Sequence, residues 1–271
     1  MNFSKFLVIK NSEISRKELR IIFVGLLFLG FLFYGSSISN GYNLDDHLAF
    51  TNNPNALNGL NDIASIFTQN SFHQGEYSFG YRPIATLSFA IEYQLFGVNP
   101  TVSHLTNLLL YIISCFLVFL LVKSLFPKIS LNTSLAIGVL FLVLPIHSEI
   151  ANNVKCRDEL LMLNFGLFST LLFLNSVGKN TWLFIPAFLS LTCSILSKKT
   201  GLVFYGIIPL CLFFHAEYSI KRILSKGIIA LLTFPFIRLF RKVTKGDINL
   251  REYHLIESPL FDSTTEIDQL S

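Results

Sequence analysis

Residues 21–38 read IIFVGLLFLGFLFYGSSI and carry no charged side chain. A run of about 18–20 apolar residues crosses a bilayer core of roughly 30 Å as a helix. The run is longer than the signal-peptide core of about 7–15 residues, so we interpret it as an uncleaved first membrane helix. Basic residues precede it and predict a cytoplasmic N-terminus; they are Lys5, Lys10, Arg16, Lys17 and Arg20.

The composition of the whole chain agrees with a membrane protein. Of 271 residues, 52% are hydrophobic and only 14% are charged, whereas a soluble domain has about 25% charged residues. The net charge of +4 comes from Lys and Arg at the ends of apolar runs, which does not indicate nucleic-acid binding. Cys115, Cys193 and Cys211 lie inside apolar runs and Cys156 in a loop, so neither a disulfide framework nor a metal site is expected.

Six further apolar runs follow the first and predict an all-α integral membrane protein with about seven transmembrane helices. They are Leu105–Val122, Thr133–Ile146, Leu160–Val177, Trp182–Leu196, Gly201–Phe214 and a weaker run, Ile223–Ile237, that Lys226 interrupts. We expect a cytoplasmic segment at 1–20, a transmembrane domain at 21–237 and the start of an outer loop at 238–271. A transporter is disfavoured, because the acidic residues lie in outer loops and not at mid-membrane.

The long outer loop, residues 40–103, contains one clear helical pattern. Pro83 is favourable at a helix start and Gly97 at a helix end. Between them Ile84, Leu87, Ile91 and Leu95 recur at helical spacing. We predict an amphipathic helix over Ile84–Phe96 that lies along the membrane face.

Two basic groups break the expected excess of positive charge on the cytoplasmic side. They are Lys198-Lys199 and the cluster Arg238, Arg241, Lys242 and Lys245. Placed outside at the ends of helices, such cations could hold a phosphate group. Alternatively, the seventh run does not cross the membrane, which would put the second group inside.

Two sets of polar residues are candidates for chemistry. The first is the pair Asp45-Asp46, just beyond the first helix; such pairs in loops are usually only solvated. The second flanks the short loop 147–159, where polar groups near the membrane tend to be functional; it comprises His147, Glu149, Arg157, Asp158 and Glu159. A metal site from His147, Glu149 and Asp158 matches no strong ligand spacing, so no metal or other cofactor is expected.

Four segments in order resemble a known family. They are DDHLAFTNN (Asp45–Asn53), YRPIATLSFAIEYQLFGVNPTVSHLTN (Tyr81–Asn107), PIHSEIANNVKCRDELL (Pro145–Leu161) and SKKTGL (Ser197–Leu202). Together they resemble the GT-C-type membrane O-mannosyltransferases that carry tetratricopeptide repeats, and their bacterial relatives. ESPLF (Glu257–Phe261) is similar to a later loop segment of that family.

The chain departs from the family pattern at several positions. Leu144 and Ser148 replace a His and a Thr, Lys199 replaces a Glu, and ESPLF lacks an Asn. The family also continues with more helices and repeats of about 34 residues, and no such repeat is found before Ser271. We therefore expect either a fragment or a short, inactive relative.

The resemblance implies a GT-C-like helix bundle in the cell membrane. It implies transfer of a sugar, a mannose-like hexose, from a polyprenyl phosphate donor to a hydroxyl of a protein or glycan on the outer face. Asp45 aligns with the family's leading acid and would be the base, while Asp46 would orient the loop or the acceptor. Substrate-binding candidates are Arg82, His104, His147, Glu149, Arg157, Glu159 and Lys198.

Two of these candidates have ordinary alternatives. Arg82 could be a snorkelling Arg at the headgroups, and His104 an ordinary residue at a helix start. For the whole chain, the alternative is a non-catalytic membrane protein, either a truncated relative or a carrier of a lipid ligand.

Overall fold

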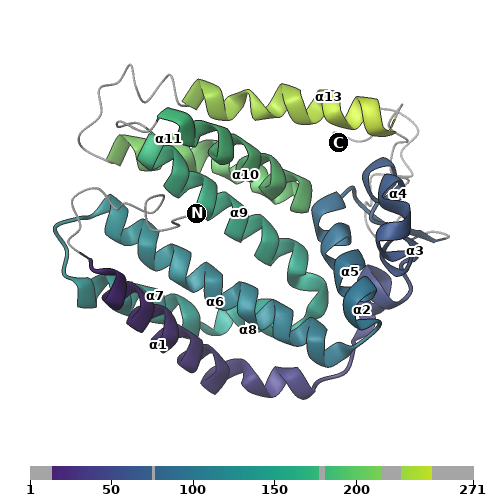
Figure 1. The fold of residues 1–271 in the computed structure, drawn as a ribbon, viewed down its shortest axis with the longest axis horizontal. Coiled ribbons are helices and arrows are strands. Elements are labelled where there is room, and N and C mark those ends of the chain that lie inside the picture. The colour runs from purple at the N-terminus through teal and green to yellow at the C-terminus, as the bar shows by residue number, and fades with distance from the viewer. Residues whose placement is uncertain (1–13, 75–76, 177–180, 215–226, 246–271) are drawn as a thin grey trace, which may run out of the picture.

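The computed structural model describes residues 14–74, 77–176, 181–214 and 227–245 (Figure 1). Within these residues the fold is helical apart from one short antiparallel hairpin. Strands β1 (Phe72–Gln74) and β2 (Tyr77–Phe79) form it, with Phe72 opposite Phe79. The prediction of a helical membrane protein is therefore confirmed in its main feature. The tail segment Glu257–Phe261 and the basic residues Lys5 and Lys10 lie outside the described residues.

The main bundle, in the part of the chain that the structure describes, includes helices that lie alongside one another (Figure 1). They are α1 (Arg16–Tyr34), α6 (Pro100–Leu125), α7 (Leu131–Val143), α9 (Arg157–Ser176), α10 (Phe184–Ser197), α11 (Phe204–Phe214) and α13 (Thr233–Lys245). Helix α9 packs against α6 on one side and α10 on the other. Helix α13 contacts α10 and α4, so it joins the bundle to the outer-loop segment.

The outer-loop segment, residues 40–99, gathers at one end of this bundle (Figure 1). Its helical elements are α2 (Leu44–Asp46), η3 (His47–Thr51), α3 (Pro54–Leu57), η4 (Gly59–Asp62), α4 (Ile63–Thr68) and α5 (Pro83–Phe96). Short turns elsewhere are η2 (Gly35–Ser39), η5 (Pro145–His147), α8 (Ser148–Asn152), η6 (Val154–Cys156), η7 (Thr181–Leu183) and η8 (Lys199–Val203).

Several of the bundle helices suit a bilayer. Among the described residues, three helical segments are long and apolar enough to cross a membrane: Arg16–Ser39, Pro100–Leu125 and Val154–Ser176. The bent pair of Leu131–Val143 and Pro145–Asn152 makes a fourth if it counts as one span. Large apolar side chains face outward on these helices; Phe28 is 65% and Leu140 57% exposed. Such exposure is unfavourable in water and suits lipid. The chain is therefore a membrane protein with several spans.

The expected count of seven spans is not established. Helices α10 and α11 have 14 and 11 residues, fewer than the roughly 17–25 of a usual span. The seventh run was expected at Ile223–Ile237, but residues 223–226 lie outside the described part. Helix α13 continues past Ile237 to Lys245, because Phe240 extends the face that packs against the core.

Helix α5 confirms the predicted helix in the loop. It begins at Pro83 and ends before Gly97, whose φ of 66° lies in the left-handed region. Its buried face carries Phe89 and Glu92, whereas Leu95 is 67% exposed. Within the Ile and Leu row, Ile84 packs against the core while Ile91 is 41% exposed, and the placement of this row along the membrane face stays a prediction.

Polar side chains join the helices at close range. Ser114 of α6 and Asn164 of α9 hydrogen-bond at 3.0 Å, and Asn164 also donates to the Leu110 carbonyl. Ser190 and Ser194 of α10 donate to carbonyls of α9. Small hydroxyl residues allow such close approach between membrane helices.

Helix α7 ends in a sharp corner that two tyrosines stabilise. The chain bends by 54° between α7 and the segment that starts at Pro145, a residue without a backbone N–H. The Leu142 carbonyl at this corner accepts hydrogen bonds from the hydroxyls of Tyr34 and Tyr111, at 3.0 and 2.9 Å. A carbonyl that the helix leaves open inside a membrane needs such partners.

Candidate functional site

Carboxylates and cations from several segments meet where α9 begins. Asp45 comes from α2, Arg82 from the start of α5 and Lys198 from the end of α10. We call this group the paired cluster; it comprises Asp45, Arg82, Lys155, Asp158, Glu159 and Lys198. Acidic residues in the first turn of α9 are favourable, because a helix N-terminus carries partial positive charge.

Each cation of the paired cluster contacts a carboxylate. Arg82 forms an ion pair with Asp158, whose side chain is only 3% exposed. Lys198 forms an ion pair with Glu159 and lies 3.8 Å from Asp158. Two predicted binding residues, Arg82 and Lys198, are thus brought to neighbouring carboxylates. Their pairing fixes the outer-loop segment to the start of α9 and the end of α10.

The two acids of the Asp45-Asp46 pair have different surroundings. The Asp45 side chain is 49% exposed, with Oδ2 at 3.1 Å from Lys155 Nζ. Asp46 is buried and accepts backbone N–H hydrogen bonds from Asn43 and Lys155, at 2.9 and 2.7 Å. Asp46 therefore fixes the loop, and Asp45 presents its carboxylate to the exterior.

Arg157 lies inside the protein, away from the exposed carboxylate of Asp45. Its Nη2 lies 2.8 Å from Glu92 Oε2, and its Nε donates to Asn107 Oδ1 at 2.8 Å. The guanidinium also stacks over the Phe89 ring, 4.1 Å from the ring centroid, and donates to the Ser103 carbonyl. Side chains of α5, α6 and α9 are joined in this way. In this arrangement a substrate has no access to Arg157, which is fully buried.

Glu92 is the buried neighbour of Arg157 that the sequence analysis missed. It is 5% exposed, accepts a hydrogen bond from Ser103 and forms an ion pair with Arg157. The signal was present as a single carboxylate within the apolar helix PIATLSFAIEYQLF. In the sequence, Glu92 looks like an exposed residue on the polar face of an amphipathic helix. Its partner Arg157 lies far away in the chain, so the pair was not predicted.

The predicted histidines and Glu149 lie on the periphery of this arrangement. His104 is buried, with Nε2 at 3.2 Å from the Gly41 carbonyl oxygen, and thus connects α6 to the loop. His147 contacts the Phe141 carbonyl through Nδ1 at 2.8 Å. It shares a cavity of about 80 Å³ with Glu159. Glu149 is exposed on α8.

Tyr42 connects the loop to the buried ion pair. Its hydroxyl lies 2.9 Å from Ser103 Oγ. Because Ser103 donates to Glu92, Tyr42 is the donor to Ser103. Burial raises the pKa of Tyr42 above its ordinary value, so the hydroxyl keeps its proton at neutral pH and this chain of hydrogen bonds persists.

The described part of the chain offers no obvious metal centre. No group of three or more His, Cys, Asp or Glu side chains within it is arranged to hold an ion. The candidate site provides cations and carboxylates, among which Asp45 and Glu159 are partly exposed at 49% and 38%; such groups suit proton transfer and the binding of a charged substrate.

Comparisons with known proteins give relatives with named activities. A protein O-mannosyl-transferase of Caenorhabditis elegans is 27% identical over 247 residues, which cover 85% of this chain and 35% of that protein. The protein O-mannosyl-transferase Tmtc1 of Drosophila melanogaster is 27% identical, over 86% of this chain and 28% of the relative. The human protein O-mannosyl-transferase TMTC3 is 30% identical, over 64% of this chain and 20% of the relative.

The chain is thus similar to proteins that are named protein O-mannosyl-transferases. The chain spans about a third or less of the length of these relatives. No family model matches the sequence, and no solved structure matches it.

Proposed function

We propose that this chain provides the catalytic base of a GT-C-type membrane glycosyltransferase. It moves a mannose-like hexose from a polyprenyl phosphate donor to a hydroxyl of a protein or glycan, on the outer face of the cell membrane. The observation that carries the proposal is the half-exposed Asp45 carboxylate, held by Lys155 at 3.1 Å beside the paired cluster. The names of the relatives support the class of reaction.

The chemistry requires one base and one stabilised leaving group. The acceptor oxygen attacks the anomeric carbon of the sugar, and the bond from that carbon to the donor phosphate oxygen breaks. The electron pair of that bond leaves with the phosphate, and the proton of the acceptor hydroxyl passes to Asp45. General-base help of this kind contributes about 10²–10⁴-fold to the rate.

The other residues of the cluster position this base. Lys155 holds Asp45 through its ammonium group and Asp46 through its backbone N–H. One residue thus fixes both members of the acidic pair. Arg82 and Lys198 anchor the surrounding segments through Asp158 and Glu159. Direct substrate contact by Glu159, His104, His147, Glu149 or Arg157 stays a prediction.

The proposed membrane arrangement places this end of the bundle outside. Segment 1–20 is then cytoplasmic, 21–237 is the transmembrane domain with its outer loop at 40–103, and 238–271 begins a further outer loop. The basic residues before the first apolar run support this orientation, since Arg16, Lys17 and Arg20 lie at the end of α1 opposite the outer-loop segment.

The substitution Asp45→Asn tests the proposal, because it keeps the shape and removes the base. Transfer of a hexose from a polyprenyl phosphate to a hydroxyl acceptor should fall about 10²–10⁴-fold. The assay follows radiolabelled sugar on the acceptor in proteoliposomes. Asp62→Asn is the matched control: it makes the same change in the same loop, and Asn caps a helix as well as Asp does, which preserves the hydrogen bond to the Ser65 N–H.

Transfer at the wild-type rate by Asp45→Asn would remove Asp45 from the mechanism, and Asp46 would be the next acid to replace. If the wild-type chain binds the lipid donor and transfers no sugar, the result favours the alternative of a non-catalytic membrane protein with a lipid ligand.

A further inference from the structure

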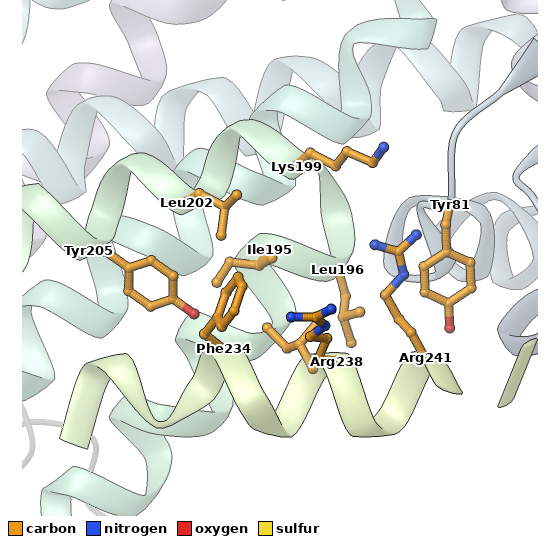
Figure 2. Close-up of a pocket in the computed structure, with 10 residues that line it drawn as sticks. Tyr81, Ile195, Leu196, Lys199, Leu202, Tyr205, Phe234, Arg238 and Arg241 are labelled. Carbon is orange, nitrogen blue, oxygen red and sulfur yellow. The ribbon is translucent and has the colours of Figure 1, made fainter. Parts of the chain in front are cut away.

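A second cavity lies next to the paired cluster, between α10, η8, α11 and α13 (Figure 2). Its volume is about 300 Å³, and Tyr81 closes one side. We call it the cationic pocket. The residues that matter for its chemistry are Lys199, Leu202, Tyr205, Phe234, Arg238 and Arg241.

The cationic pocket has a charged end and an apolar end. Figure 2 shows Lys199 and Arg241 toward Tyr81, and Leu202, Tyr205 and Phe234 at the other end, with the Arg238 guanidinium between them. Arg241 stacks over the Tyr81 ring, 5.2 Å from its centroid. The Tyr205 hydroxyl is held by Thr233, which leaves the ring surface to line the apolar end.

Within the described residues, the lining of this pocket carries cations without an acid beside them in the lining. Within the described parts of the chain, neither Lys199 nor Arg238 forms an ion pair. Lys199 and Arg238 both line this cavity and repel each other, and an anion in the cavity would relieve this repulsion.

We propose that the cationic pocket binds the phosphate and the first isoprene units of an isoprenyl phosphate lipid. The inference rests on the proposed function for the identity of this lipid as the donor. Arg side chains and Lys form strong charge-assisted hydrogen bonds to phosphate oxygens. Leu202, Tyr205 and Phe234 then receive the adjoining apolar units.

The volume of the cationic pocket suits only the phosphate end of such a lipid. About 300 Å³ is at the lower end of the range for ligand pockets, too small for a whole polyprenyl chain. The rest of the chain would leave between helices toward lipid, where Leu210 and Phe213 of α11 are 55% and 66% exposed. The proposal thus moves the phosphate contact from Arg82 and Lys198, which hold carboxylates, to Lys199, Arg238 and Arg241.

The experiment measures binding of farnesyl phosphate to the purified chain in nanodiscs of neutral lipid, by native mass spectrometry or calorimetry. Wild type should bind it saturably. Arg238→Gln and Lys199→Gln should each weaken binding about tenfold or more, because each removes one charged donor to phosphate. Arg238→Lys should retain most of the affinity. Lys242→Gln is the matched control, since Lys242 is an exposed cation of the same helix and does not line the cavity.

Three comparisons identify the ligand. Farnesol lacks the phosphate and shows how much the phosphate contributes to binding. Inorganic phosphate lacks the isoprene units and shows how much the apolar part contributes. Phosphatidylglycerol shows whether the pocket binds anionic lipids in general. Each should bind at least tenfold more weakly than farnesyl phosphate. Equal binding of any one of them would overturn the proposal, as would unchanged farnesyl phosphate binding by both Arg238→Gln and Lys199→Gln.

Circular dichroism shows whether these variants keep the helical content of the wild type. The binding assay contains neither sugar nor acceptor. Its result is therefore independent of the Asp45→Asn transfer assay, and a failure of either proposal is recognised separately.

Discussion

The paired cluster and the cationic pocket lie side by side but use positive charge in different ways. Tyr81 lines the pocket while its neighbour Arg82 contacts Asp158; Lys199 lines the pocket while Lys198 contacts Glu159. In the cluster each cation meets a carboxylate of the same chain. In the pocket the lining contains no acid. The difference indicates that the first set of charges fixes the outer-loop segment to the bundle and that the second is kept for a ligand.

We expect the largest effect on stability when the buried ion pair between Arg157 and Glu92 is broken. Arg157→Met leaves the Glu92 carboxylate in the interior with no cation, so we expect a loss of about 3–5 kcal/mol in the free energy of unfolding. The measurement is thermal or denaturant unfolding in detergent, followed by helical circular dichroism. Arg238→Met, at an exposed Arg in the pocket, should change stability by no more than about 0.5 kcal/mol.

The double variant Glu92→Gln with Arg157→Met sharpens this test. It removes the uncompensated carboxylate, and part of the lost stability should return. An equal loss for Arg238→Met and Arg157→Met would contradict the distinction between the two regions, because it would show the pocket cation to be as structural as the buried one.

A smaller effect is expected at Asp158. Asp158→Asn removes the carboxylate that Arg82 contacts, although Lys198 keeps Glu159. We expect a loss of about 1.5–3 kcal/mol, the range for a hydrogen bond to a charged group, in the same unfolding measurement. Glu149→Gln, at an exposed acid of α8, serves as the control. A melting temperature equal to that of the wild type would mean that the Arg82 contact does not hold α5 in place.

The smallest effect is expected at the rim of the cluster. Lys155→Ala removes an ion pair with Asp45 in which both side chains are partly exposed, at 26% and 49%. Such pairs contribute about 0–1 kcal/mol. The backbone N–H of residue 155 still bonds Asp46, so the loop keeps its anchor. The free energy of unfolding of Lys155→Ala should stay within about 1 kcal/mol of the wild-type value. A loss as large as that of Arg157→Met would show that this ion pair is less exposed to water than its side chains indicate.

The sequence predicted the helices better than their partners. Apolar runs gave the helices of the bundle, and Pro83 with Gly97 gave α5, because these signals are local in the chain. The burial of Glu92 depends on Arg157, which lies on another helix, so periodicity within α5 could not show it. The run that was expected to end at Ile237 is divided at residue 232, and its second helix, α13, continues to Lys245, because its packing partners lie on other elements.

The candidate site was predicted as a set of residue types and not as an arrangement. In the structure Arg82 pairs with Asp158, Lys198 with Glu159 and Asp45 with Lys155, and the roles of these residues stay predictions. The sequence could not show that Asp46 bonds the backbone of Lys155 or that Arg157 is enclosed, since both contacts join segments that are far apart in the chain. Nor could it show which of two adjacent lysines faces a carboxylate.

The tyrosine corner at the end of α7 has a consequence for mutational robustness. The Leu142 carbonyl accepts two hydroxyls, from Tyr34 and Tyr111, while one is enough to satisfy it. Loss of either hydroxyl, as in a change to Phe, would leave the other donor in place. Because the two donors come from different helices, a single substitution cannot remove both. This corner is therefore buffered against point mutation, whereas the Arg157–Glu92 pair, with one carboxylate for one guanidinium, has no such reserve.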